Sequence, residues 1–311
     1  MSPPPTGVAP VIDAPSLGLA TGRRSSRTLQ LLSDYAELTK PKVQSLLLLT
    51  TIATMYIAGD PSVVLVALTC MGGYLSAGGA GAVNHWFDRD IDAQMARTAT
   101  RPIPAGRISP RAALVFGCTL AALSLLELSL TVNPLAAALS FSGFLGYVFV
   151  YTLWLKRRTP QNIVIGGAAG AVPPLVGWAA VTGSVSGTAV ILFFIVFFWT
   201  PPHFWALSLL MKDEYEKVGV PMLPVVRGEQ ETRRQILLYS VLLYAVTQLP
   251  ACAGGFGAIY LTSSLLLGLG FIAGAVMLYR RADRRSALRL YLYSLSYLAL
   301  LFCAMVADRH L

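Results

Sequence analysis

The stretch that decides the fold is "SVVLVALTCMGGYLSAGGAGAVNHWFDRDIDAQMART", Ser62 to Thr98. Its first part, Ser62 to Val83, carries no charge and is long enough to cross a bilayer as a helix, which takes about 20 apolar residues. Its second part, Asn84 to Thr98, follows at once with three aspartates, two arginines, a histidine and an asparagine. This order predicts a membrane-spanning helix that ends in a chemically active segment at the membrane surface.

The whole chain has the composition of an integral membrane protein. Of its 311 residues, 55% are hydrophobic and 13% are charged, against roughly 25% charged in soluble domains, and the mean hydropathy is +0.62. The apolar stretches predict an all-α protein with nine transmembrane helices. These stretches cover about residues 42–59, 62–85, 111–131, 134–155, 161–181, 188–210, 234–254, 257–279 and 287–307.

Charge placement supports this count and sets an orientation. Lysine and arginine collect on the cytoplasmic side of membrane proteins. If the N-terminus is inside, nine spans place every lysine and arginine except Arg309 on that side. We therefore predict an inside N-terminus and an outside C-terminus, and we attribute the net charge of +9 to orientation rather than to nucleic-acid binding.

The domain organisation follows from composition. Residues 1–33 are rich in Pro, Ser, Gly and Thr and are predicted to be a disordered cytoplasmic tail, whereas residues 34–311 form one nine-helix domain. The two long inside loops follow the second and sixth spans and both begin with acidic clusters. Because they lie four spans apart, we expect them to meet over one cavity.

Asn84, Asp88 and Asp92 recur at every fourth residue. On a helix this spacing puts all three on one stripe, which we call the acidic ridge, while Asp90 points away from it. Amide and carboxylate oxygens are ligands that suit Mg²⁺, which completes its shell with water and substrate phosphates. The ridge therefore predicts a magnesium site. The alternative from spacing alone is a solvated helix whose charges pair with one another.

Arginines that follow the ridge complement a metal-bound phosphate, because guanidinium groups match phosphate oxygens. Arg97, Arg101 and Arg107 lie within the same inside loop. A magnesium diphosphate at the membrane surface, with its lipid tail among the apolar helices, fits this combination. The residues thus favour a prenyl diphosphate as ligand.

Longer blocks resemble the UbiA superfamily of intramembrane prenyltransferases, and within it the protoheme IX farnesyltransferase (heme O synthase) branch. The resemblance runs in order from about Leu38 to Arg234. It is carried by "LTKPKV" (Leu38 to Val43), "NHWFDRDIDAQMARTATRPIPAGRIS" (Asn84 to Ser109), "YTLWLKRRTPQNIVIGGAAGAVPPLVGW" (Tyr151 to Trp178), "WTPPHFWALSL" (Trp199 to Leu209) and "GVPMLPVVRGE" (Gly219 to Glu229).

The resemblance implies a UbiA-like bundle in the inner (cytoplasmic) membrane, with its active site toward the cytoplasm. It implies transfer of the farnesyl group of farnesyl diphosphate to a vinyl group of heme B, with water addition, giving heme O and diphosphate for heme-copper oxidases. Mg²⁺ is the implied cofactor and heme B is a substrate. A downstream heme A synthase is a candidate partner.

It also implies roles for particular residues. Asn84, Asp88 and Asp92 would bind the magnesium diphosphate, and the second acidic loop would add Asp213. Candidates for contacts to the diphosphate are Lys40, Lys42, Arg97, Arg101, Arg107, Lys156 and Lys217.

The chain departs from the superfamily pattern in two places. Lys217 stands where many members have a second aspartate, so the second loop lacks a full acidic motif. The superfamily's Tyr-x-x-x-Lys is not met either, since Lys156 is five residues from Tyr151 and Thr152 holds the matching position.

Two histidines fall in the resembling blocks. His203 follows Pro201-Pro202 inside the sixth span, where prolines open the helix. Imidazole is a common iron ligand, so we predict that His203 binds or orients heme; a structural histidine is the alternative. His85, beside Asn84, is open to either reading.

Two other functions remain for comparison. A prenyltransferase of the same class could use a quinone precursor or a chlorophyllide as acceptor. A nine-span transporter would also give an inside-positive bundle, but it would place ionisable groups near the midplane, whereas here they gather at the inside face. This distribution favours capture of an anionic head group.

Overall fold

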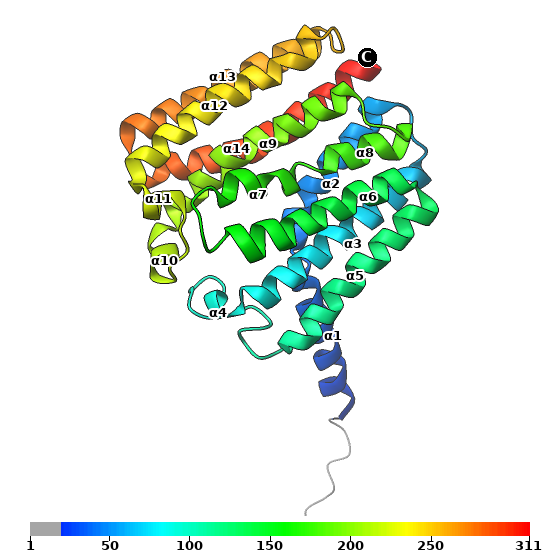
Figure 1. The fold of residues 1–311 in the computed structure, drawn as a ribbon, viewed down its shortest axis with the longest axis vertical. Coiled ribbons are helices and arrows are strands. Elements are labelled where there is room, and N and C mark those ends of the chain that lie inside the picture. The colour runs from blue at the N-terminus through cyan, green and yellow to red at the C-terminus, as the bar shows by residue number, and fades with distance from the viewer. Residues whose placement is uncertain (1–19) are drawn as a thin grey trace, which may run out of the picture.

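The structure, a computed structural model, describes residues 20–311, which form long helices lying side by side (Figure 1). The first half of the chain contains α1 (Ala20–Leu38), α2 (Pro41–Ala58), α3 (Val63–Phe87), α4 (Arg89–Asp92), α5 (Pro110–Thr131), α6 (Pro134–Leu145) and the π-helix η1 (Gly146–Leu155). The second half contains α7 (Asn162–Gly170), α8 (Pro173–Thr182), α9 (Gly187–Leu210), α10 (Lys212–Lys217), α11 (Leu223–Val226), α12 (Gly228–Cys252), α13 (Ala258–Arg281) and α14 (Arg284–His310).

The described residues include 8 helical segments long and apolar enough to cross a membrane. α6 continues into η1, and α7 and α8 together make another such segment. The multi-pass membrane class is therefore confirmed. The first predicted span, residues 42–59, coincides with α2 but is not one of these segments, because α2 begins with the polar Lys42 and Gln44. Nine spans and their orientation stay predictions.

Short polar residues begin several of the long helices. Ser62, Ser109 and Ser186 each accept a hydrogen bond from the backbone three residues on, at 3.2, 3.2 and 3.3 Å. Asn133 does the same at 2.8 Å and Asp283 at 2.6 Å. Each cap satisfies a backbone N–H that the first helical turn leaves without a partner, so these side chains fix where the helices enter the bundle.

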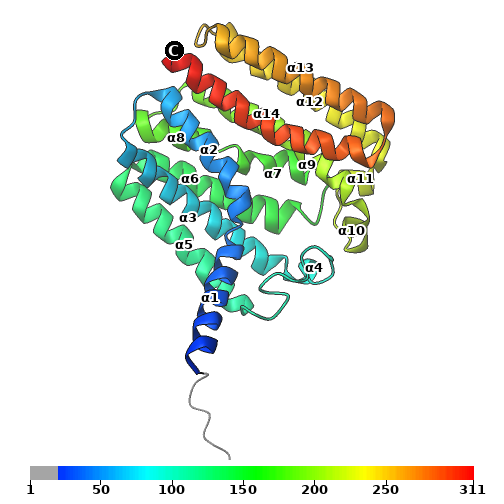
Figure 2. The same ribbon diagram turned by 180° about the vertical axis from the view of Figure 1, so that it is seen from behind.

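The short helices α4, α10 and α11 lie at one end of the long helices, and the C-terminus lies at the other (Figures 1 and 2). α2 runs beside α14 on the face seen in Figure 2. The two long loops are thus at the same end of the bundle, as expected from their spacing of four spans.

Small residues allow α3 and α5 to pack closely. A Cβ on Gly79 would lie 2.7 Å from the Gly117 carbonyl oxygen, and a Cβ on Gly117 would lie 2.9 Å from that of Gly79. Only glycine permits this approach. The larger core lies around α9 and α12 to α14, where Leu192, Tyr260 and Tyr297 are buried.

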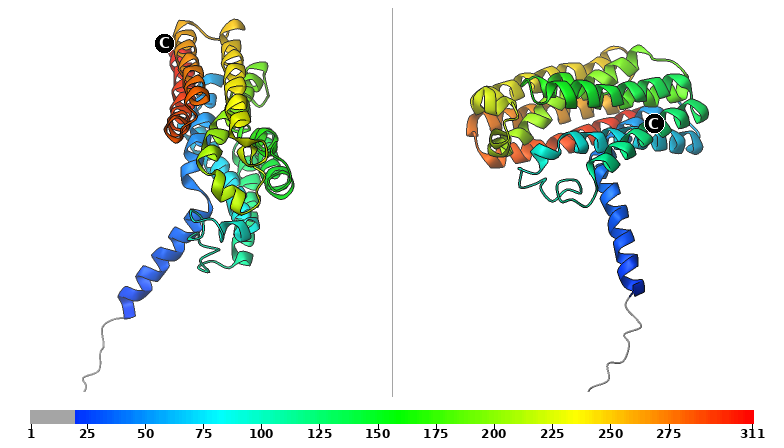
Figure 3. Two further views of the ribbon diagram at one scale, coloured as in Figure 1. Left: turned by 90° about the vertical axis from the view of Figure 1, so that its left-hand side faces the viewer. Right: turned by 60° about the horizontal axis from the view of Figure 1, so that its bottom comes forward.

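The prediction of a disordered tail over residues 1–33 is wrong for residues 20–33, which belong to α1. From Leu29 to Leu32 the chain consists of leucine and glutamine, which favour a helix, and Gln30 hydrogen bonds to Asp34 one turn later at 3.2 Å. α1 leaves the bundle at an angle, as both views of Figure 3 show. The rest of the predicted tail, residues 1–19, lies outside the described residues.

Candidate active site

The acidic ridge runs along the end of α3 and through α4. The backbone N–H of Asp88 bonds to the carbonyl of Asn84 at 2.9 Å, and that of Asp92 to the carbonyl of Asp88 at 2.8 Å. The helical path therefore continues across the break between α3 and α4, and the three residues share one face. All three are buried, with 3%, 1% and 4% of their surface exposed, so the ridge is not a solvated helix face.

Cations from other parts of the chain meet this ridge. The Lys156 ammonium, at the end of η1, contacts Asp88 Oδ2, and Arg101 Nη1 lies 2.7 Å from Asp92 Oδ2. Asn84 Nδ2 donates to Asp88 Oδ2 at 2.8 Å. Two of the predicted phosphate ligands, Lys156 and Arg101, are thus brought to the ridge.

Lys40 joins the site from the junction between α1 and α2. Its Nζ donates to Asn84 Oδ1 at 2.5 Å and to the Tyr147 hydroxyl at 3.4 Å, and it forms no ion pair with any described residue. Burial, together with the charges of Arg101 and Lys156, lowers the pKa of the Lys40 ammonium to about 7, while Asp88 and Asp92 oppose this shift. A buried amine without an acidic partner is suited to an anionic ligand.

The backbone of Lys40 is also unusual. Its φ of 55° and ψ of 55° lie in the left-handed region, which costs a residue with a side chain about 1–3 kcal/mol. Glycine would adopt this turn at no such cost. The ammonium contacts that lysine makes here therefore offset the conformational cost that glycine would avoid.

The π-helix η1 changes the interpretation of the Tyr151 to Lys156 spacing. In a π-helix each turn holds one residue more than in an α-helix, and the Lys156 N–H bonds to the Tyr151 carbonyl, five residues back, at 2.9 Å. The two residues are therefore one turn apart despite the extra residue. Thr152 faces the ridge as well, since its Oγ1 accepts from Asn84 Nδ2 at 3.2 Å.

Gly166 of α7 makes room for Tyr151. A Cβ at this position would lie 2.4 Å from Tyr151 Cδ2. Tyr151 in turn lies against Tyr147, with 5.3 Å between their ring centroids. The ridge is thus flanked by two tyrosine rings on η1.

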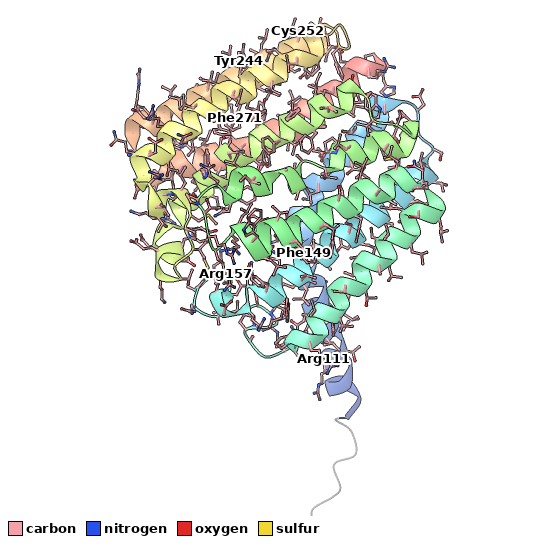
Figure 4. All side chains as sticks on the ribbon, viewed as in Figure 1. Arg111, Phe149, Arg157, Tyr244, Cys252 and Phe271 are labelled. Atoms are coloured by element: carbon pink, nitrogen blue, oxygen red, sulfur yellow. The ribbon has the colours of Figure 1, made fainter. Side chains whose placement is uncertain are left out.

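Asp90 points away from the ridge, as predicted, and pairs with an arginine. Both of its oxygens lie 2.7 Å from the Arg157 guanidinium, and these hydrogen bonds hold the pKa of Asp90 near 2. Arg157 lies at the α4 end of η1, at the opposite end of the bundle from Cys252 (Figure 4). The pair ties η1 to α4 and so fixes the ridge against Lys156.

The second loop reaches the site through residues that the sequence did not single out. Burial raises the pKa of the Tyr215 phenol on α10, while the nearby charges of Lys156, Arg97 and Arg101 lower it. The next residue back, Glu214, has a buried Oε2 with no hydrogen-bond partner. α10 is therefore close to the ridge, and Tyr215 and Glu214 are its inward residues.

Several predicted ligands do not meet the ridge in this structure. Lys42, Asp213 and Lys217 are exposed, and none of their side chains has a hydrogen bond or ion pair with the described residues. Arg107 turns instead toward α1, where its Nε lies 2.9 Å from Asp34 Oδ1. Only the tertiary fold could show this partner, since Asp34 is distant in sequence. Arg97 is exposed but close enough to influence Tyr215.

The two histidines of interest have different surroundings. His203 lies in the core between α9 and α14, and its Nδ1 is 2.6 Å from Ser294 Oγ. His85 is 2% exposed and both of its ring nitrogens are buried without a hydrogen-bond partner. Neither makes a hydrogen bond or ion pair with a ridge carboxylate among the described residues.

The residues of the ridge fit a divalent cation. No group of three or more His, Cys, Asp or Glu side chains that could hold a metal occurs in the described part of the chain, but Mg²⁺ needs only one or two protein carboxylates when phosphate and water supply the rest. Asp88 Oδ1 is buried without a hydrogen-bond partner, and its nearest charged neighbour is the Arg157 guanidinium at 3.6 Å. Asp88 and Asp92 would be the carboxylates that hold the cation.

Fold and site together define the class of this protein: a multi-pass helical membrane protein with a buried, cation-flanked acidic ridge at one end of its bundle. Comparison with known proteins gives the family. The UbiA prenyltransferase family matches residues 47–302, and the chain belongs to this family.

Its relatives include proteins named protoheme IX farnesyltransferase. The one from Symbiobacterium thermophilum is 53% identical over 293 residues, which cover 93% of this chain and 98% of the relative. The one from Chloroflexus aurantiacus is 57% identical over 279 residues, 89% of this chain and 48% of the relative. The chain thus spans about half the length of some relatives, the Chloroflexus protein among them.

Solved structures share the fold. A digeranylgeranylglyceryl phosphate synthase superimposes with a TM-score of 0.75 at 20% identity, over 90% of this chain and 99% of the other. A UbiA homologue from Archaeoglobus fulgidus bound to DMAPP and Mg²⁺ gives a TM-score of 0.62 at 16% identity, over 88% and 99%. The predicted UbiA-like architecture is confirmed.

Proposed function

We propose that this protein transfers the farnesyl group of farnesyl diphosphate to a vinyl group of heme B, with addition of water, releasing diphosphate and forming heme O. The observation that supports heme B as the acceptor substrate is the 53% identity to a protein named protoheme IX farnesyltransferase along 98% of that relative. The acidic ridge with its cations supports the donor. The product would serve heme-copper oxidases, with a heme A synthase as the next enzyme.

Asp88 and Asp92, with Asn84, would hold Mg²⁺, which suits a UbiA homologue found bound to DMAPP and Mg²⁺. When bound, the metal offsets the charge on the leaving diphosphate. Asn84 positions Asp88 through the hydrogen bond between their side chains. Asn84 Oδ1, which accepts from Lys40, would be the amide oxygen available to the metal.

Lys40, Arg101 and Lys156 bind the diphosphate oxygens in this mechanism. In the structure Arg101 and Lys156 pair with the ridge, and Lys40 has no acidic partner among the described residues. Arg97, near Tyr215, adds a further cation at the mouth of the site. Donors placed where the negative charge develops stabilise the departing diphosphate most.

Tyr147 and Tyr151 present aromatic faces beside these cations. Lys40 Nζ lies 5.9 Å from the Tyr147 ring centroid. Such faces stabilise a cation without reacting as nucleophiles would. The two rings therefore support the carbocation-like carbon that forms when the allylic carbon–oxygen bond breaks.

The protein carries out this reaction in the inner membrane. We propose that α2 is the first of nine spans, that the N-terminus is inside, and that the ridge faces the cytoplasm. Under this topology every lysine and arginine except Arg309 lies inside, and the short helices α4 and α10 lie at the cytoplasmic end.

The test is an incubation of the protein in detergent with heme B, farnesyl diphosphate and Mg²⁺, followed by mass spectrometry of the extracted heme. We expect a product heavier by one farnesyl group and one water, absent when EDTA replaces Mg²⁺ and absent for Asp92→Asn. Unchanged heme together with prenylation of a quinone precursor would show a different acceptor. No prenyl transfer to any acceptor by folded protein would refute the proposal.

A further inference from the structure

The His203 ring is held between two other rings. The Trp199 ring, one helical turn back on α9, is stacked at 4.3 Å and 19° on one side. Tyr291 of α14 is stacked at 4.9 Å and 28°. The histidine is 6% exposed. The two stacked rings fix the plane of the imidazole.

Ser294 determines which nitrogen carries the proton. Its Oγ lies 2.6 Å from His203 Nδ1 and donates to the Tyr291 carbonyl at 2.6 Å. A serine hydroxyl has a single hydrogen and two lone pairs. With that hydrogen on the Tyr291 carbonyl, the hydroxyl accepts from His203 Nδ1, and this arrangement favours the neutral ring with its proton on Nδ1.

The rest of α14 keeps this arrangement in place. Trp199 Nε1 donates to the Ser294 carbonyl at 2.8 Å, so the same residue anchors the ring that covers His203. Ser294 itself is fully buried. His203 Nε2 makes no hydrogen bond to any described residue, which leaves its lone pair free.

We propose that Ser294 is a positioning residue that fixes His203 in the Nδ1–H form, so that the bare Nε2 becomes the axial ligand of the heme iron. This inference rests on the proposed function, since it takes heme B as the acceptor. Histidines that bind metals donate their other N–H to a neighbour that sets the tautomer and the ring orientation. α14 thereby takes part in acceptor binding although its sequence carries no recognisable motif.

The first experiment is ¹⁵N NMR of histidine-labelled protein in detergent without heme. The chain has only 3 histidines, and His203→Ala identifies the signals of this ring. Couplings to the ring protons distinguish Nδ1 from Nε2. We expect Nε2 of His203 to be unprotonated in the wild type and in Ser294→Thr, which keeps the hydroxyl, and to become largely protonated in Ser294→Ala.

Ser286→Ala is the matched control. Ser286 lies on the same helix, is 3% exposed, and its hydroxyl makes no hydrogen bond to His203. This variant should leave the tautomer of His203 unchanged. A wild-type ring with its proton on Nε2, or a tautomer that Ser294→Ala does not alter, would overturn the inference whatever the activity of the protein.

The second experiment is a titration of the same proteins with ferric heme, followed by optical and EPR spectra that report nitrogen ligation. Loss of the hydroxyl should weaken heme binding about 10- to 100-fold, and His203→Ala should abolish the nitrogen-ligated spectrum. If wild type converts heme B but shows no His203-dependent ligation, this inference fails while the proposed function stands. If wild type prenylates a different acceptor and binds no heme, both fail.

Discussion

Lys40→Met should separate ligand binding from folding. The side chain reaches Asn84 and Tyr147 but forms no ion pair with the described residues, so the change removes one buried positive charge and little packing. Methionine is no more strained than lysine at a φ of 55°. We therefore expect a folded protein with weakened affinity for the prenyl diphosphate.

The size of the effect follows from the bond that is lost. A hydrogen bond to a charged partner contributes about 1.5–3 kcal/mol, which corresponds to a dissociation constant raised about 10- to 150-fold. Lys42→Met is the matched control, because Lys42 is two residues on and exposed. This variant also removes one lysine charge from the chain, but that charge lies outside the site.

The assay is calorimetric titration, in detergent with Mg²⁺, of an unreactive sulfur analogue of farnesyl diphosphate, with a thermal melt of each variant. We expect Lys40→Met to bind weakly and melt near the wild-type temperature, and Lys42→Met to match wild type in both. Equal affinity of Lys40→Met and wild type would refute the role given to Lys40. An equal loss in Lys42→Met would show that the effect is general attraction of an anion.

Three further outcomes test the site. Gly166→Ala should destabilise the protein by about 1–3 kcal/mol through overpacking against Tyr151, whereas Gly170→Ala on the same helix, where nothing lies within 4 Å, should be neutral or stabilising in a denaturant titration. Asp88→Asn should abolish farnesyl transfer while Asp90→Asn, outside the ridge, should keep most of it; similar turnover by both in the heme assay would contradict the ridge assignment. Because Lys40 is deprotonated near pH 7 when folded and near 10.5 when unfolded, the unfolded state binds more protons between these values. Stability should then rise with pH across that window, and a melt series in which Lys40→Met rises as steeply as wild type would contradict this.

Local spacing was enough to predict the parts of the site that one helix carries. Asn84, Asp88 and Asp92 share a face because helical hydrogen bonds continue through Asp88, and Asp90 points away for the same reason. Periodicity acts within a segment, so it predicts which residues share a face. It does not say which distant residue will meet that face.

Residues that meet across the fold could not be predicted in this way. Arg107 has the chemistry of a phosphate ligand, yet Asp34 on α1 takes it away from the ridge. Ser294 lies in a helix whose sequence shows only hydropathy. Its proposed role exists because His203 lies within hydrogen-bond distance of its hydroxyl. Such roles are set by tertiary packing, which a single sequence does not display.

The π-helix shows that the meaning of a spacing depends on the type of helix. Tyr151 and Lys156 are one residue too far apart for an α-helical turn, so the Tyr-x-x-x-Lys pattern of the superfamily is not met in the sequence. η1 absorbs the extra residue through its wider turn, and the Lys156 N–H bonds to the Tyr151 carbonyl. Spacing predicts a common face only when the type of helix is known.

The ion pairs of the ridge also explain how metal and diphosphate can depend on each other. Without a metal, Lys156 and Arg101 are held by Asp88 and Asp92 and are less available to a phosphate. If Asp88 and Asp92 held a divalent cation, Lys156 and Arg101 would be free to bind the diphosphate, whose oxygens are ligands that suit Mg²⁺. Since coupling between two ligands is reciprocal, each should bind more tightly in the presence of the other. Lys40, which has no carboxylate to leave, can bind the diphosphate in either order.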